Sequence, residues 1–155
     1  MITNEVKKYL ENSVLCWLAT VNTKFEPNVS PKEMFVFQND KSILIANIAS
    51  PISERNILEN PLVCVSFVDV LVQKGFKMKG IATVISKKDP EFTSKLQMLT
   101  NKFSDKYPIH SIIEIKVTRI LPIIAPSYLL FPQSTTEESQ IQNAIERYKL
   151  KRTQD

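Results

Sequence analysis

Residues 73–87 read QKGFKMKGIATVISK and alternate in character with a period of two residues. One set of alternate positions is Phe76, Met78, Gly80, Ala82 and Val84, and the other is Lys77, Lys79, Ile81, Thr83 and Ile85. Successive side chains of a β-strand point to opposite faces of a sheet, so the alternation predicts one long strand. A glycine inside such a stretch is typical of a β-bulge, which we expect at Gly80.

Five further strands are predicted on either side of this stretch. They cover residues 14–21, 28–37, 42–48, 62–68 and 111–121. Turn-forming residues at 22–27 and 38–41 join the first three closely. Six strands with tight early turns and few helices favour a mainly β fold with flanking helices, arranged as a six-stranded antiparallel barrel.

Helices are predicted at four places around this barrel. Thr3 is suited to cap a short N-terminal helix, and Ser53 to cap a helix of one to two turns that Pro61 ends. The sequence Asp89-Pro90-Glu91 is typical of a helix start, with a cap, a proline at the first position and an acid in the first turn. A C-terminal helix is expected at about residues 137–151.

Three of the predicted strands are apolar on both faces, at residues 14–21, 42–48 and 62–68. A small barrel buries one face of each strand in its interior, so the other face must meet a helix or a second subunit. The pattern therefore predicts a homodimer.

Composition limits the class of protein. The chain has 155 residues, 43% of them hydrophobic and 23% charged, which suits a single globular domain over residues 1–155. No apolar run approaches the ~20 residues of a membrane span, and the N-terminus has no signal-peptide core, so we expect a cytoplasmic protein without a membrane partner. Cys16 and Cys64 read as reduced thiols, and with a single histidine, His110, no metal site is expected.

Common catalytic motifs are absent from the sequence. With only two glycines, Gly75 and Gly80, it has no glycine-rich phosphate loop, and hydrolytic chemistry would depend on His110 alone. The net charge of +4 is concentrated partly at residues 74–88, which contain five lysines and no acid. Such a run is either a solvated face or a site for a phosphate-bearing ligand, and without interleaved aromatics it does not favour a nucleic-acid partner.

Three segments carry the functional signal. They are residues 19–32 with Ala19-Thr20-Val21 and Pro27 to Lys32, residues 45–61 with Ile45-Ala46-Asn47-Ile48 and Ser53 to Pro61, and Lys77-Met78-Lys79-Gly80-Ile81-Ala82. In this order and spacing they resemble the flavin-binding split barrels of the pyridoxamine 5'-phosphate oxidase family. The resemblance extends over about residues 14–88 and implies a split barrel that dimerises and binds two flavin mononucleotide (FMN) molecules at the subunit interface.

The resemblance also implies which residues bind FMN. Carried over by position, the second strand follows the ring and the ribityl chain with Asn28, Val29, Ser30, Pro31 and Lys32. The end of the third strand meets the edge of the ring with Ala46, Asn47 and Ile48. The turn of residues 50–56 faces the phosphate and contributes Ser53, Arg55 and Asn56, and the candidate cations are Lys32, Arg55 and Lys79. A helix N-terminus at this turn independently favours an anion.

Each of these residues has a simpler structural interpretation. Ser53 can do no more than cap its helix, and Asn56 can do no more than close the turn. Lys32 and Lys79 can be solvated strand residues. Trp17 is interpreted as a core or interface residue and not as a partner that stacks on the flavin.

The chain departs from the oxidases themselves at two places. Ser50-Pro51-Ile52-Ser53 stands where they carry an arginine–lysine pair, and the residues after Tyr148 include Arg152 but no histidine. Both departures argue against pyridoxamine-phosphate oxidation.

The leading hypothesis is an FMN-dependent oxidoreductase that acts on a small molecule. The cofactor carries the chemistry, and no catalytic residue is assigned. The alternatives are a non-catalytic flavin carrier, electron-transfer module or stress sensor, or a barrel that binds deazaflavin or haem.

Overall fold

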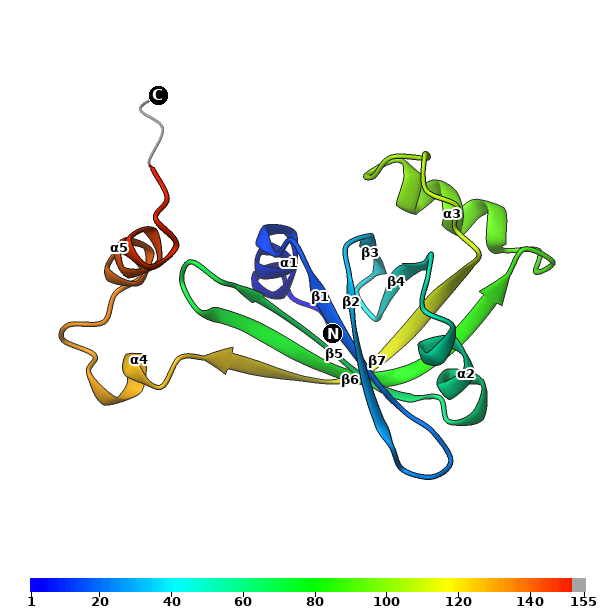
Figure 1. The fold of residues 1–155 in the computed structure, drawn as a ribbon, viewed down its shortest axis with the longest axis horizontal. Helices are drawn as coiled ribbons and strands as arrows, with labels where there is room; N and C mark the ends of the chain where they lie inside the picture. The colour runs from blue at the N-terminus through cyan, green and yellow to red at the C-terminus, as the bar shows by residue number, and fades with distance from the viewer. Residues whose placement is uncertain (152–155) are drawn as a thin grey trace.

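A computed structural model describes residues 1–151 and shows one antiparallel sheet of seven strands surrounded by helices (Figure 1). The strands lie in the order β2-β1-β5-β6-β7-β4-β3. Their bounds are β1 (Cys16–Val21), β2 (Pro27–Lys32), β3 (Phe35–Asn39), β4 (Ser42–Asn47), β5 (Leu62–Asp69), β6 (Lys74–Ser86) and β7 (Ser111–Ile124). The helices are α1 (Asn4–Asn12), α2 (Pro51–Glu59), α3 (Phe92–Thr100), α4 (Ser127–Leu130) and α5 (Glu137–Tyr148). The mainly β prediction is confirmed.

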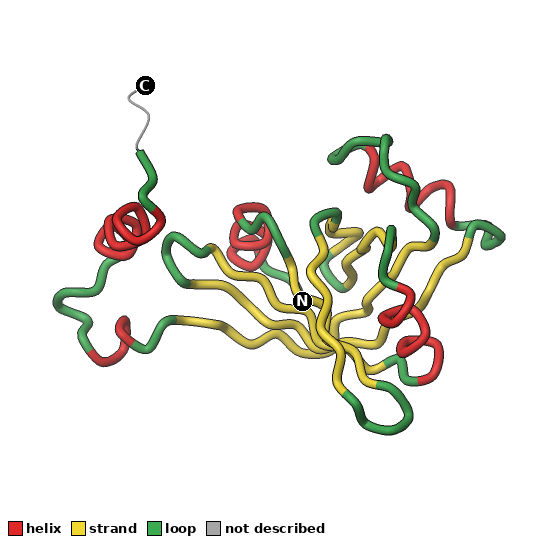
Figure 2. The backbone as a smooth tube through the Cα atoms, viewed as in Figure 1, coloured by secondary structure: helices red, strands yellow, loops and turns green. Residues whose placement is uncertain are grey.

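Strands β6 and β7 form the long central pair of the sheet (Figure 2). The predicted strand at residues 73–87 is confirmed, and its alternation decides which side chains are buried. The pair shifts register between Lys79 and Gly80, as expected for a bulge. A side chain at position 80 would bring its Cβ to 2.5 Å from the backbone oxygen of Lys116, so only glycine allows the two strands to approach here.

The prediction of six strands is wrong because the segment 28–37 is two strands and not one. The chain turns at Glu33 and Met34, after which β3 pairs with β4 while β2 pairs with β1. Met34, Phe35 and Val36 are buried in succession, which interrupts the alternation that a single strand would keep. The extra strand comes from this corner.

The same corner determines the shape of the sheet. β2 and β3 are the two edge strands, yet only residues 33 and 34 separate them in the chain. The sheet must therefore curl until its edges approach each other at this corner. In residues 1–151 no ladder pairs β2 with β3, so the sheet stays open.

Two apolar clusters hold the sheet and helices together. The larger one lies on the inner face of the curled sheet, under α1, with Leu18, Phe67 and Met78 fully buried. The smaller one joins the opposite face of β4 to α3 through Leu44 and Leu99. The strand predicted at 42–48 is apolar on both faces because the same chain buries both of them.

A buried ion pair links α3 to the sheet beside the smaller cluster. The Lys95 ammonium lies 2.7 Å from a Glu114 carboxylate oxygen on β7 and 2.9 Å from a carboxylate oxygen of Glu91. The side chains of Lys95 and Glu114 are 6% and 13% exposed. Charges at such depth depend on their partner for stabilisation.

The other two doubly apolar strands leave one face exposed. The registers of β2, β1, β5 and β6 place Trp17, Val29, Leu62 and Ile81 on the same outer face of the sheet. Trp17 is 46% exposed and Leu62 is 63% exposed. We call this set of four residues the outer apolar face.

The helices follow the predictions with three shifts. Thr3 caps α1 by accepting a hydrogen bond from the Val6 amide, as predicted. Ser53 is not a cap, because Pro51 occupies the first turn and α2 begins there, after Ser50. α3 begins at Phe92, since Asp89 instead accepts hydrogen bonds from Ser86. α5 ends at Tyr148, and the next residue, Lys149, adopts a left-handed backbone conformation.

Among residues 1–151, no helix combines the length and the apolar character that crossing a bilayer requires.

Candidate functional site

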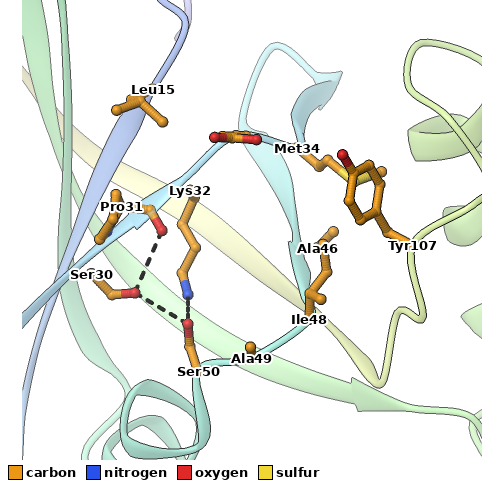
Figure 3. A pocket seen from close by; sticks show the side chains of 11 residues that line it. Leu15, Ser30, Pro31, Lys32, Met34, Ala46, Ile48, Ala49, Ser50 and Tyr107 are labelled. Carbon is orange, nitrogen blue, oxygen red and sulfur yellow. Dashed lines mark hydrogen bonds between the residues drawn. The ribbon is translucent and has the colours of Figure 1, made fainter.

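A cavity of about 490 Å³ opens beside the corner between β2 and β3 (Figure 3). Its lining comes from the end of β2, the end of β4, the segment before α2 and the loop before β7. The residues are Leu15, Ser30, Pro31, Lys32, Glu33, Met34, Ala46, Ile48, Ala49, Ser50 and Tyr107. The cavity therefore lies where the two edges of the sheet approach each other, and its volume suits an organic cofactor.

Lys32 is the most unusual group in this cavity. The residue is only 5% exposed, and within the described residues its ammonium forms no ion pair. Its partner is the Ser50 hydroxyl, which accepts a hydrogen bond from Nζ. Burial lowers the pKa of the Lys32 ammonium below its ordinary value. A buried ammonium without a carboxylate is suited to bind an anionic group that enters the cavity.

Two hydroxyls lie at the Lys32 end of the cavity. The Ser50 hydroxyl lies 3.1 Å from that of Ser30, so both hydroxyls face the same part of the cavity (Figure 3). Ser50 is also the N-cap of α2, but its side chain makes no capping hydrogen bond. The first turn of α2 thus keeps the free amides and the positive dipole end that favour an anion.

Asn47 fixes the position of Ser50. Its side-chain oxygen accepts a hydrogen bond from the Ser50 amide at 3.2 Å, and its Nδ2 donates to Ser111 at 3.0 Å. Asn47 Nδ2 and the Ser111 hydroxyl also donate to one carboxylate oxygen of Glu54. Asn47 is 3% exposed and does not line the cavity, so its side chain positions the start of α2.

Three other predicted residues form a second polar group, between α2 and strands β1 and β2. Asn28 Nδ2 donates to Thr20 at 3.3 Å and to the Ser53 hydroxyl at 3.2 Å, and Asn56 Nδ2 donates to Thr20 at 3.0 Å. Ser53 and Asn56 are 1% and 4% exposed. These hydrogen bonds attach α2 to β1 and β2, so all three side chains hold the scaffold of the site.

The remaining predicted positions divide between the cavity and other surfaces. Ser30, Pro31, Lys32, Ala46 and Ile48 line the cavity, whereas Val29 belongs to the outer apolar face. Arg55 lines a separate hollow beside the β1–β2 turn, and Lys79 lines another on the outer side of the sheet. Within one chain, neither cation joins Lys32.

Six lining residues were not among the residues predicted to bind the cofactor, although one of them, Ser50, begins the turn that was expected to face the phosphate. They are Leu15, Glu33, Met34, Ala49, Ser50 and Tyr107. Leu15 and Met34 give the cavity apolar walls, and Tyr107 comes from the loop before β7. Leu15 read as part of an apolar strand, and Met34 read as the middle of one. Tyr107 lies outside every segment that carried the resemblance. Only the curl of the sheet brings Leu15, Met34 and Tyr107 together.

Cys16 lies directly opposite Lys32 in the β1–β2 ladder. Burial raises the pKa of its thiol to about 12, and the nearby Lys32 only partly offsets this effect. The side chain thus stays a neutral thiol at physiological pH. It supplies no counter-charge for Lys32.

Comparisons with known proteins cover the part of the chain that contains this cavity. The sequence model of the pyridoxamine 5'-phosphate oxidase family matches residues 2–123, which include all of the lining residues. The match ends before α4 and α5. No curated protein sequence matches the chain.

Solved structures share this fold. HupZ of Group A Streptococcus is 24% identical, with a TM-score of 0.67 over 79% of this chain and 94% of its own. An FMN-binding protein from Syntrophomonas wolfei is 16% identical, with a TM-score of 0.64 over 77% of this chain and 86% of its own. HutZ, the haem storage protein of Vibrio cholerae, is also 16% identical, with a TM-score of 0.64 over 77% and 93%. At these identities the likeness is one of fold.

Proposed function

Because this chain belongs to the pyridoxamine 5'-phosphate oxidase family, we propose that it is an FMN-binding split-barrel protein that works as a homodimer. The observation that carries the proposal is the buried Lys32 ammonium, which has no carboxylate partner among residues 1–151. A terminal phosphate is the anion that FMN would bring to it.

The residues of the cavity fit both ends of FMN. Lys32, Ser50 and Ser30 would hold the phosphate beside the positive dipole end of α2. Leu15, Met34, Ala46 and Ile48 provide apolar walls for a flat ring. Asn47 and Asn56 contribute indirectly, by fixing α2.

FMN, when bound, supplies hydride or single-electron chemistry. The chain's own contribution is to bind the cofactor, to orient it from the phosphate end and to exclude water with the apolar walls. Besides Lys32, the titratable lining residues are Glu33 and Tyr107, and both are exposed. We favour a flavin-dependent oxidoreductase acting on a small molecule, with a non-catalytic carrier or electron-transfer role as the second candidate.

The dimer is proposed from the outer apolar face. Trp17, Val29, Leu62 and Ile81 lie on one face of paired strands, where a monomer would leave these apolar side chains in water. Lys79 and Arg55 lie outside the cavity of their own chain, so in a dimer the contact of either cation with FMN would come from the partner copy.

Purified protein incubated with FMN and passed through gel filtration should elute with flavin absorbance bands at ~375 and ~450 nm. The cofactor should be retained at about one FMN per chain. Protein that elutes colourless would contradict the flavin proposal, and a Soret band would support haem instead. Reduction of the bound flavin by a nicotinamide donor and reoxidation by a substrate separates an oxidoreductase from a carrier.

A charge placed on the outer apolar face should dissociate the dimer. We expect Leu62→Asp to elute as a monomer in light scattering, because a charged carboxylate would replace an apolar side chain in the buried interface. Val70→Asp is the matched control, since Val70 is similarly exposed but lies on the β5–β6 turn. A dimeric Leu62→Asp would rule out this face as the interface.

A further inference from the structure

A second cavity of about 410 Å³ adjoins the first, between the end of α1, the start of β3 and residues 102–107. The two cavities share Glu33, Met34 and Tyr107 in their linings. Met34 and Tyr107 lie away from the Lys32–Ser50 end of the first cavity, as Figure 3 shows. Ligands in the two cavities would therefore meet across Met34 and Tyr107.

The second cavity has an aromatic wall with a cation on it. The Lys102 ammonium lies 6.0 Å from the ring centroid of Phe35 and 5.4 Å from that of Phe103. Phe35 is 2% exposed, so its ring belongs to the core under this wall, and Tyr107, which is 54% exposed, offers the open aromatic surface. Aromatic walls of this kind favour a flat ligand.

The charges at this cavity define the polar part of the ligand. Glu11 and Glu33 line it together with Lys102, and within the described residues none of the three forms an ion pair. Two carboxylates and one ammonium disfavour an anionic ligand. A ligand that satisfies both kinds of group needs a carbonyl acceptor for Lys102 and an N–H donor for a carboxylate.

We propose that this second cavity binds a neutral aromatic carboxamide beside the cofactor. A carboxamide has both the acceptor and the donor in one planar group, and the attached ring lies against the aromatic wall. The inference deepens the proposed function, on which it rests for the identity of the neighbouring ligand, because it names the chemical class of the second molecule at the site.

Nicotinamide and nicotinate are a matched pair of probes, identical except for the amide and the carboxylate. We expect nicotinamide to bind FMN-loaded protein at least about tenfold more tightly than nicotinate, measured by ligand-observed NMR titration. Lys102→Met should weaken nicotinamide binding by about tenfold. Lys106→Met changes an exposed lysine of the same loop that does not line the cavity, and it should leave the affinity unchanged.

The same titration on cofactor-free protein separates this inference from the proposed function. FMN binding with no nicotinamide binding overturns the inference alone. Nicotinamide binding that depends on Lys102, in a protein that does not retain FMN, supports the second cavity and overturns the flavin proposal. Nicotinate binding as tightly as nicotinamide, or an unchanged affinity in Lys102→Met, also overturns the inference.

Discussion

Replacing Lys32 with methionine should weaken FMN binding by about 100-fold while making the cofactor-free protein more stable, by about 1 kcal/mol. Both effects have the same origin. A buried ammonium without a carboxylate costs free energy in the folded state, and the phosphate of FMN would supply the missing charge. Fluorescence titration measures the affinity, and urea denaturation at pH 7 measures the free energy of unfolding.

Lys88→Met is the control, because Lys88 is exposed after β6 and lines none of the cavities described. It should change neither the FMN affinity nor the free energy of unfolding.

The pH dependence of the free energy of unfolding gives a further check. Burial lowers the Lys32 pKa, so the folded protein loses this proton before the unfolded chain does. The free energy of unfolding of the wild type should therefore rise as the pH increases from the lowered pKa to the ordinary pKa of 10.5. The excess stability of Lys32→Met over the wild type should shrink over the same pH range. Loss of stability together with loss of FMN would identify Lys32 as a structural residue only.

Lys95→Met should lower the free energy of unfolding by about 3 kcal/mol and the melting temperature by about 10 °C. The substitution keeps most of the apolar volume but leaves the Glu114 carboxylate, 13% exposed, without its ammonium partner. Chemical denaturation followed by circular dichroism measures the loss. FMN affinity at a temperature where the variant is folded should not change, because Lys95 does not line the cofactor cavity.

Glu91→Gln separates the buried ion pair from the exposed one. Glu91 is the second partner of Lys95, but its side chain is 55% exposed, so its removal should cost less than 1 kcal/mol. If Lys95→Met costs no more than Glu91→Gln, the link between α3 and β7 depends on apolar packing alone.

The alternation at residues 73–87 was sufficient to predict the long central strand, because burial in a sheet follows side-chain direction. The corner at Glu33 and Met34 was not predicted. Residues 28–37 read as one strand in the sequence, and the pairing of its two halves with different neighbours divides it. Strand pairing is a long-range property that a local pattern does not contain.

The candidate site was likewise predicted only in part. Ser30 and Lys32 were predicted from the resemblance and line the cavity. Asn28, Ser53 and Asn56 were predicted with them, but their side chains bond to one another or to Thr20. A sequence motif does not distinguish a residue that contacts a ligand from one that supports it, since both belong to the same site. Tyr107 is far away in sequence and needed the fold to be found.

The open edges of the sheet also bear on how this chain avoids aggregation. Exposed edge strands offer unpaired backbone groups to the strands of other molecules. Here β2 contains Pro27 and Pro31, which have no amide hydrogen to donate, and β3 is only five residues long. The chain can therefore keep its sheet open beside the cavity without presenting a long edge on which fibrils could grow.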